Sequence, residues 1–315
     1  MRHSLFAAGL IVAVSAFCQV TAQTGTPSDF AKAQAAYHAL PDTPGSGPYP
    51  AVKLSEPAFP DHVVYRPADL RALGNRKLPI VLWGSGGCTD DGASERFFLS
   101  EIASHGYLAI APGNIYSGPG AVPPPPPPPA GAPLSARTSA QQVLQGLDQA
   151  LAVNAAPGPL HDRIDTSRVA VAGFSCGGLQ ALSDAGDPRI KAVVIMHSGI
   201  FNQGGEPIKG MHVEKSLLGT LHTPVLYLLG GPTDIAYANG TDDVSRIDKV
   251  PVFYANHNVG HGGTYQQPNG GEEAQIVRSW LDWQLFGDAK AGAMFQGADC
   301  TLCKNPEWTI VRKKL

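Results

Sequence analysis

Short runs of consecutive apolar residues alternate with segments of helical periodicity from about residue 60 to residue 287. Runs this short and this uniformly apolar are typical of strands that are buried on both faces of a sheet. Their alternation with helices predicts a mostly parallel central sheet that carries helices on both faces, an α/β fold. The predicted strands are 62–67, 79–83, 107–111, 168–172, 192–196, 224–229 and 251–255, and the predicted helices are 96–105, 135–153, a short segment after residue 175, and 273–285.

The first 22 residues have the pattern of a secretory signal peptide. Two polar residues precede an apolar run over 5–14 that is too short to span a bilayer, and small residues lead up to Ala22. We therefore expect residues 1–22 to be removed and the protein to be secreted or periplasmic. The alternative is a lipoprotein anchored through Cys18, although Phe17 directly before that cysteine fits such a site poorly.

Composition divides the remainder of the chain into three parts. Residues 23–60, rich in Pro, Gly, Ser and Ala, are expected to form an extended N-terminal arm, and 61–287 a single α/β domain. Residues 288–315 form a C-terminal tail. A Pro-rich loop over 117–134 interrupts the domain, and its seven consecutive prolines, 123–129, predict a stiff polyproline II segment. This loop either forms a rim at the edge of the sheet where active-site loops lie, or is a surface spacer.

Charge and residue spacing argue against several classes of partner. The chain has 26 acidic and 23 basic residues, a formal net charge of −3, so no basic surface for nucleic acid is indicated. No stretch after the signal peptide is long and apolar enough to cross a membrane. The histidines of the mature chain show no metal-ligand spacing, so no metal is expected.

Four cysteines remain once the signal peptide is removed: Cys88, Cys176, Cys300 and Cys303. An even number in an exported protein predicts two disulfides, and the residues alone allow three pairings. Four free thiols are the alternative. The Cys300-x-x-Cys303 spacing also occurs in redox and zinc sites, but neither a thioredoxin-type setting nor a second ligand pair accompanies it.

The segment 173–177 reads Gly-Phe-Ser-Cys-Gly and fits the pattern Gly-x-Ser-x-Gly. It lies between a predicted strand and a helix-compatible run, so it predicts a sharp turn that lifts the Ser175 hydroxyl above the sheet. The two glycines are needed because larger side chains at those positions would collide. A tight turn without chemistry is the alternative.

A serine hydroxyl becomes a good nucleophile only with a base and an acid that orients the base. Asp234 follows a predicted strand through a glycine turn, and His261 lies in a glycine-rich loop after the last predicted strand. Asp242 and Asp243 are the alternative candidates for the acid. If neither serves as the acid, they are expected to be a solvated pair in a loop. His257 is the alternative candidate for the base. If it is not the base, it is expected to be a structural or rim residue at the end of the strand.

The loop 84–88, Gly-Ser-Gly-Gly-Cys, has the small residues that let backbone approach an acyl oxygen. We expect Ser85 or Gly86 to donate its N–H to an oxyanion together with the N–H of Cys176. A dinucleotide-binding turn is the alternative, but the glycine spacing does not give that fingerprint.

With these residues in this order, the chain resembles the α/β-hydrolase family over about 60–287. Within that family it is most similar to secreted esterases of the chlorophyllase/cutinase-like and dienelactone-hydrolase-like groups. Trp83-Gly84 stands where many lipases and esterases carry His-Gly. The resemblance implies an α/β-hydrolase fold and cleavage of carboxylic esters through an acyl-enzyme, without a cofactor. Little sequence separates the acid from the preceding strands, so no large cap domain is expected.

The same resemblance implies a disulfide pairing. It places Cys88 at the end of the oxyanion loop and Cys176 beside the nucleophile, so these two cysteines are expected to pair. Cys300 and Cys303 would then pair within the tail. The expected substrate is a small-molecule or polymeric ester. The alternatives are a peptidase or polyester depolymerase that uses the same triad, and a non-catalytic binding protein on the same fold.

Overall fold

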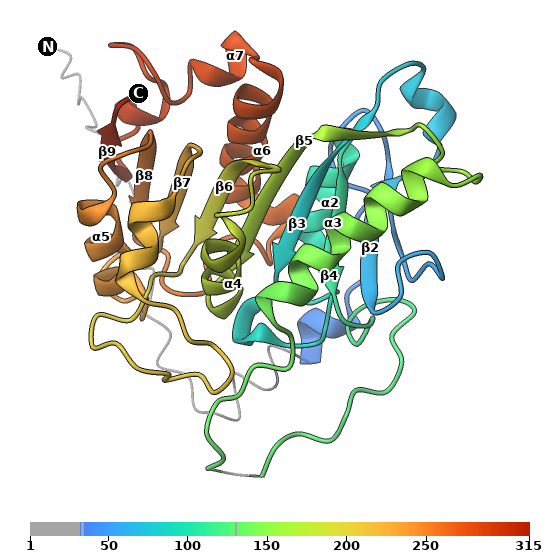
Figure 1. Ribbon diagram of the computed structural model, residues 1–315, viewed down its shortest axis with the longest axis horizontal. Helices are drawn as coiled ribbons and strands as arrows, with labels where there is room; N and C mark the ends of the chain where they lie inside the picture. The colour runs from blue at the N-terminus through green and yellow to red at the C-terminus, as the bar shows by residue number, and fades with distance from the viewer. Residues whose placement is uncertain (1–31, 33–34, 130) are drawn as a thin grey trace, which may run out of the picture. The chain divides into compact units, whose positions relative to one another are not determined.

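A single sheet organises the computed structural model, which describes residue 32 and residues 35–129 and 131–315 (Figure 1). The described strands follow the order β1-β2-β4-β3-β5-β6-β7-β8-β9, and all neighbours from β4 to β8 are parallel. The pairs β1–β2, β2–β4 and β8–β9 are antiparallel. The strands are β1 (Ala51–Leu54), β2 (His62–Pro67), β3 (Leu78–Gly84), β4 (Leu108–Pro112), β5 (Ile164–Phe174), β6 (Ile190–Met196), β7 (Val225–Leu229), β8 (Val252–His257) and β9 (Trp308–Lys313).

Helices cover both faces of this sheet and enclose two apolar cores (Figure 1). On β3, Ile80 and Leu82 belong to the core under α3 and α4, whereas Val81 and Trp83 belong to the core under α2 and α6. Both faces of the strand are therefore dry, which explains its uninterrupted apolar run. The helices are α2 (Arg96–Ser104), α3 (Ala140–Ala155), α4 (Cys176–Asp184), α5 (Tyr237–Arg246), α6 (Gly271–Phe286) and the short α7 (Ala289–Gly292). The predicted fold class is confirmed.

The two edge strands lie where the sequence analysis expected an arm and a tail. β1 comes from the segment 23–60 and β9 from the segment 288–315. Their burial is incomplete because an edge strand has a neighbour on one side only, and charged residues interrupt the apolar runs by which the inner strands were recognised. α5 was also missed, since its sequence is rich in Gly, Asn and Asp.

Arg96, at the start of α2, fixes part of the expected arm to the domain. Its buried guanidinium donates from Nη2 to the carbonyl oxygens of Tyr37 and Leu40, and its Nε lies 3.1 Å from Asp42. The segment after residue 37 is therefore a packed part of the fold. The predicted signal peptide, residues 1–22, lies outside the described residues.

The seven prolines form part of the long green loop between β4 and α3 (Figure 1). All of them are exposed, and they belong to no described helix or strand. The polyproline II conformation stays a prediction. Among the described helices, none combines the length and apolar character needed to cross a lipid bilayer.

Asp184, at the end of α4, makes the stability of the fold depend on pH. Its side chain is buried, and its Oδ2 has no hydrogen-bond partner among the described residues. Burial, with a contribution from Asp187, raises the pKa of Asp184 from 3.8 to about 8. The folded state therefore binds a proton more tightly than the unfolded chain does, and stability falls as pH rises from about 4 to about 8.

We expect Asp184→Asn to raise the free energy of unfolding by ~1–3 kcal/mol at about pH 9, and by much less at about pH 4. Urea unfolding at the two pH values measures the difference. Asp187→Asn is the control: hydrogen bonds from Arg189 lower the pKa of Asp187, so its loss destabilises the protein at about pH 9. A gain for Asp184→Asn that is equal at both pH values would contradict the assignment.

Candidate active site

Ser175 stands on a strained turn between β5 and α4. Its backbone angles are φ 53° and ψ −121°, values that a residue with a side chain rarely adopts. The Ser175 N–H donates to the Met196 carbonyl oxygen at 2.9 Å, which fixes the turn to β6. A Cβ on Gly173 would run into the Gly177 carbonyl oxygen, and a Cβ on Gly177 into that of Gly84. The turn thus requires glycine on both sides of the serine.

A continuous chain of hydrogen bonds links Ser175, His261 and Asp234. His261 Nε2 lies 2.9 Å from Ser175 Oγ, and His261 Nδ1 lies 2.6 Å from Asp234 Oδ1. An ionised Asp234 only accepts, so Nδ1 carries the proton and Nε2 is left to accept from the serine hydroxyl. The structure therefore brings together the three residues predicted as nucleophile, base and acid, from the ends of β5, β8 and β7.

Asp234 is surrounded by donors. Oδ1 also accepts from the Ala236 N–H, and Oδ2 accepts from the Gly230 N–H and from Nδ1 of His197, each at 2.9 Å. Burial acts to raise the pKa of Asp234, but the hydrogen bonds from His197 and His261 outweigh it and hold the pKa well below its usual range. Asp234 is therefore a carboxylate at neutral pH.

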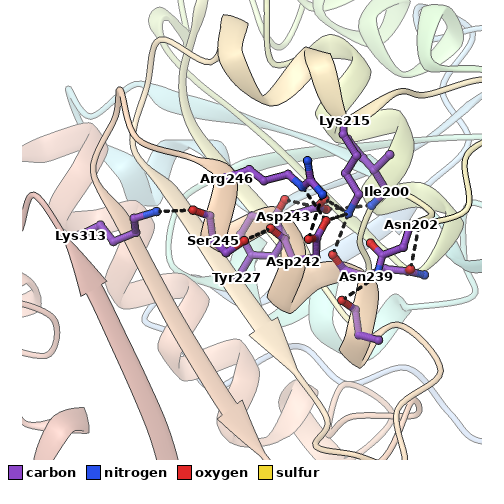
Figure 2. A network of polar contacts seen from close by, with 11 residues as sticks. Ile200, Asn202, Lys215, Tyr227, Asn239, Asp242, Asp243, Ser245, Arg246 and Lys313 are labelled. Carbon is purple, nitrogen blue, oxygen red and sulfur yellow. Dashed lines mark hydrogen bonds and ion pairs between the residues drawn. The ribbon is translucent and has the colours of Figure 1, made fainter.

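Asp242 and Asp243, the alternative acids, take part in a separate network on α5 (Figure 2). Asp243 accepts from Lys215 Nζ at 2.6 Å and from the Ile200 N–H at 2.8 Å, while Asp242 pairs with Lys215 and Arg246. Asp243 is fully buried, and burial raises its pKa to about 6 against the effect of Lys215. The two residues are thus not a solvated loop pair, and this network anchors α5 instead.

The alternative base, His257, occupies the last position of β8. Its ring packs against Trp308 of β9 with centroids 4.9 Å apart. Of the two histidines after β8, His261 is the one whose ring nitrogens face Asp234 and Ser175. His257 is therefore part of the contact between the last inner strand and the edge strand.

The carboxyl group of Glu95 accepts a hydrogen bond from Gly86, one of the two loop residues predicted to donate an N–H to the oxyanion. Its Oε1 accepts from the Gly86 N–H at 3.3 Å, and its Oε2 accepts from the indole N–H of Trp83 at 3.1 Å. Burial raises the pKa of Glu95 to about 7, against hydrogen bonds from Ser94 and Trp83. Within residues 37–129 and 131–315, no hydrogen bond uses the N–H groups of Ser85 or Cys176. Both residues are buried, Ser85 with 0% and Cys176 with 1% of its surface exposed.

The structure contains both of the disulfides implied by the resemblance. Cys88 and Cys176 are joined across 88 residues of sequence, with their Cα atoms 5.2 Å apart. The Cys88 carbonyl oxygen accepts from the N–H groups of Arg137 and Thr138, so the end of the Pro-rich loop is attached to the same point. The second bridge, Cys300–Cys303, closes a local turn in the C-terminal segment.

Three buried polar residues around this site were not singled out from the sequence: Glu95, His197 and Glu273. A usable signal existed for His197, since it directly follows a predicted buried strand at the same sheet edge as Ser175. Glu95 and Glu273 each adjoin the start of a predicted helix, a common place for an exposed acid. In the described part of the chain, no group of three or more His, Cys, Asp and Glu side chains could hold a metal ion.

Comparison with known families decides between the two groups of esterases that the chain resembles. A sequence model of the dienelactone hydrolase family matches residues 86–283, about two thirds of the chain. The chain belongs to the dienelactone hydrolase family. This family is part of the α/β-hydrolase superfamily, so the protein is a hydrolase of the α/β-hydrolase type and the suspected resemblance is confirmed. No curated protein matches the chain at a significant level.

In this dienelactone hydrolase family member, we expect loss of the Cys88–Cys176 bridge to affect stability and turnover together. The variant Cys88→Ala/Cys176→Ala should lose ~2–4 kcal/mol of unfolding free energy, because the bridge closes a loop of 88 residues. Its kcat should fall about tenfold, because the bridge ties the loop that contains Ser85 to the start of α4 beside Ser175.

The matched control is Cys300→Ala/Cys303→Ala, whose bridge spans a separation of 3 residues. It should lose less than ~2 kcal/mol and keep its kcat. Denaturant unfolding and ester turnover measure both effects. Equal losses for the two variants would contradict a special role for the first bridge.

Proposed function

We propose that this protein is a serine hydrolase that cleaves carboxylic esters through an acyl-enzyme. The observation that carries the proposal is the hydrogen-bonded chain from Ser175 Oγ through His261 to Asp234, on a strained turn in a member of the dienelactone hydrolase family. Nucleophile, base and orienting acid in this geometry are the requirements for acyl transfer by serine.

The reaction follows from which atoms donate and accept. Ser175 Oγ attacks the ester carbonyl carbon while its proton passes to His261 Nε2, and the carbonyl electron pair moves to the oxygen. The tetrahedral intermediate then collapses, the bond to the alcohol oxygen breaks, and His261 gives its proton to the departing alcohol. Water repeats the sequence on the acyl-enzyme and releases the acid. Asp234 keeps Nδ1 protonated and stabilises the imidazolium that forms.

The oxyanion is proposed to accept from the N–H groups of Cys176 and Ser85. Gly86 was an equal candidate from the sequence, but its N–H already donates to Glu95. The Cys176 N–H lies at the first turn of α4, so the helix dipole adds to the stabilisation of negative charge. The Cys88–Cys176 bridge ties both donor segments together.

Export to the periplasm or the medium belongs to the same proposal. It is supported by two disulfides, which form in oxidising compartments, and by the signal-peptide pattern of residues 1–22. Ser175 and His261 are both partly exposed, so small esters and the ends of ester polymers can approach them. A panel of esters from short acyl chains to polymeric substrates would rank these.

We expect Ser175→Ala to lower kcat for a p-nitrophenyl ester by about 10³- to 10⁶-fold and to abolish labelling by a fluorophosphonate probe. Asp234→Asn should cost on the order of 10⁴-fold, because an amide at this position favours the wrong His261 tautomer. Steady-state kinetics and probe labelling of purified protein give both results.

The two histidines after β8 provide a matched comparison. His261→Gln should lose activity to a similar extent as Ser175→Ala, whereas His257→Gln should stay within about twofold of the unmodified enzyme. Full ester turnover by folded Ser175→Ala protein would refute the proposed function.

A further inference from the structure

His197, directly after β6, is buried between two carboxylates. Its Nδ1 lies 2.9 Å from Asp234 Oδ2, and its Nε2 lies 2.8 Å from Glu273 Oε1 on α6. The side chains of His197, Asp234 and Glu273 are at most 1% exposed. A buried ion cluster of this kind costs desolvation energy, so its presence beside the triad calls for an explanation.

The donors and acceptors fix the charge of His197. Asp234 is a carboxylate, and Glu273 Oε2 accepts from the Thr264 N–H at 2.9 Å. Ionised carboxylates only accept, so both ring nitrogens of His197 must donate, and a ring with two N–H groups is an imidazolium. Burial opposes this charge, but Glu273 and Asp234 outweigh burial and raise the pKa of His197 to about 9.

The backbone at His197 is held in an unusual conformation. Its φ of 46° is positive, although the residue has a bulky side chain, and its N–H donates to the Leu228 carbonyl oxygen. Positive φ in such a residue costs energy and persists only where the surroundings enforce it. Here that conformation directs the ring toward the triad acid.

Glu273 connects His197 to the loop that carries His261. Besides accepting the Thr264 N–H, Glu273 donates its own N–H to Thr264 Oγ1 at 3.1 Å. A Cβ on Gly263 would collide with both the Glu273 carboxylate and His197 Nε2. The loop is thus wrapped closely around the His197–Glu273 pair.

We propose that His197 is a positioning residue, an imidazolium that orients Asp234 and, through Glu273, holds the His261 loop in register with it. The proposal rests on the proposed function, since it assigns a role around the same triad. The charged and titratable groups facing this cluster are Asp234 from the β7 loop, Glu273 from α6, and His261, whose ring centroid is 6.3 Å from that of His197. His257 and Tyr265 lie within electrostatic range of Glu273.

A positioning role acts on kcat, because the acid and the base lose their alignment while the ground-state binding of the ester does not depend on it. KM should therefore change little. A residue with a purely structural role would change stability without lowering kcat per folded active site.

The first test is His197→Asn, whose amide can still donate to Asp234 but carries no charge and does not reach Glu273. We expect kcat to fall on the order of ten- to a hundredfold with little change in KM. Active sites are counted by fluorophosphonate labelling, so misfolded protein does not enter kcat.

The second test, Glu273→Gln, keeps the hydrogen bonds and removes the charges. The amide can donate to a neutral His197 Nε2 and accept from the Thr264 N–H, so folding is preserved. We expect a smaller loss of kcat than in His197→Asn, because the hydrogen bonds on both sides of the cluster are kept. The matched control is Glu272→Gln, the neighbouring acid, which accepts from Trp308 Nε1 and should leave kcat unchanged.

Ser175→Ala distinguishes failure of the proposed function from failure of the positioning role. If Ser175→Ala is inactive while folded His197→Asn and Glu273→Gln keep the unmodified kcat, the positioning role is overturned and the proposed function stands. If Ser175→Ala keeps full activity, the proposed function fails, and the positioning role fails with it. Loss of kcat per labelled active site in both variants, with little change in KM, supports the positioning role.

Discussion

The close approach of three glycines is the constraint on which this site depends. Gly84 ends β3, while Gly173 and Gly177 flank Ser175, and none of them has room for a Cβ. Because the start of α4 can therefore pack against the end of β3, the strained serine turn and the loop after β3 share one small volume. The bridge between Cys88 and Cys176 closes the same contact covalently. The shape of the site therefore follows from the close packing of the backbone at these glycines.

Parallel strands collect the remaining groups at the same edge. β5, β6, β7 and β8 are consecutive neighbours, and they end at Ser175, His197, the Asp234 loop and the His261 loop. The residues are far apart in the sequence, yet the sheet order alone brings them side by side. α6 then adds Glu273 from one face of the sheet. The site is thus assembled by strand order, and its charges are paired across different elements.

The sequence predicted the inner strands and the order of Ser175, Asp234 and His261, because each of these features is local. A buried strand is a continuous apolar run, and each triad candidate follows such a strand through a glycine-containing turn. The edge strands β1 and β9 were not found, since their polar faces meet solvent. His197 and Glu273 were not found either. His197 follows a predicted strand, which is a usable local signal, but its pairing with Glu273 of α6 is a contact that no sequence spacing encodes. For the same reason, the burial of Asp243 could not be foreseen.

The role of His197 and Glu273, which lie behind Asp234, is not limited to keeping Asp234 ionised. Backbone N–H groups of Gly230 and Ala236, with His261, already give Asp234 three donors, enough to keep a carboxylate ionised. A buried imidazolium and a second buried carboxylate are therefore not required for its charge, and their desolvation costs stability. What they add is a connection, since one rigid ring spans from the acid to the residue that holds the base loop. In the proposed mechanism the acid and the base lie on different loops, so their relative position has to be fixed by a third element, and the His197–Glu273 pair is placed to do this.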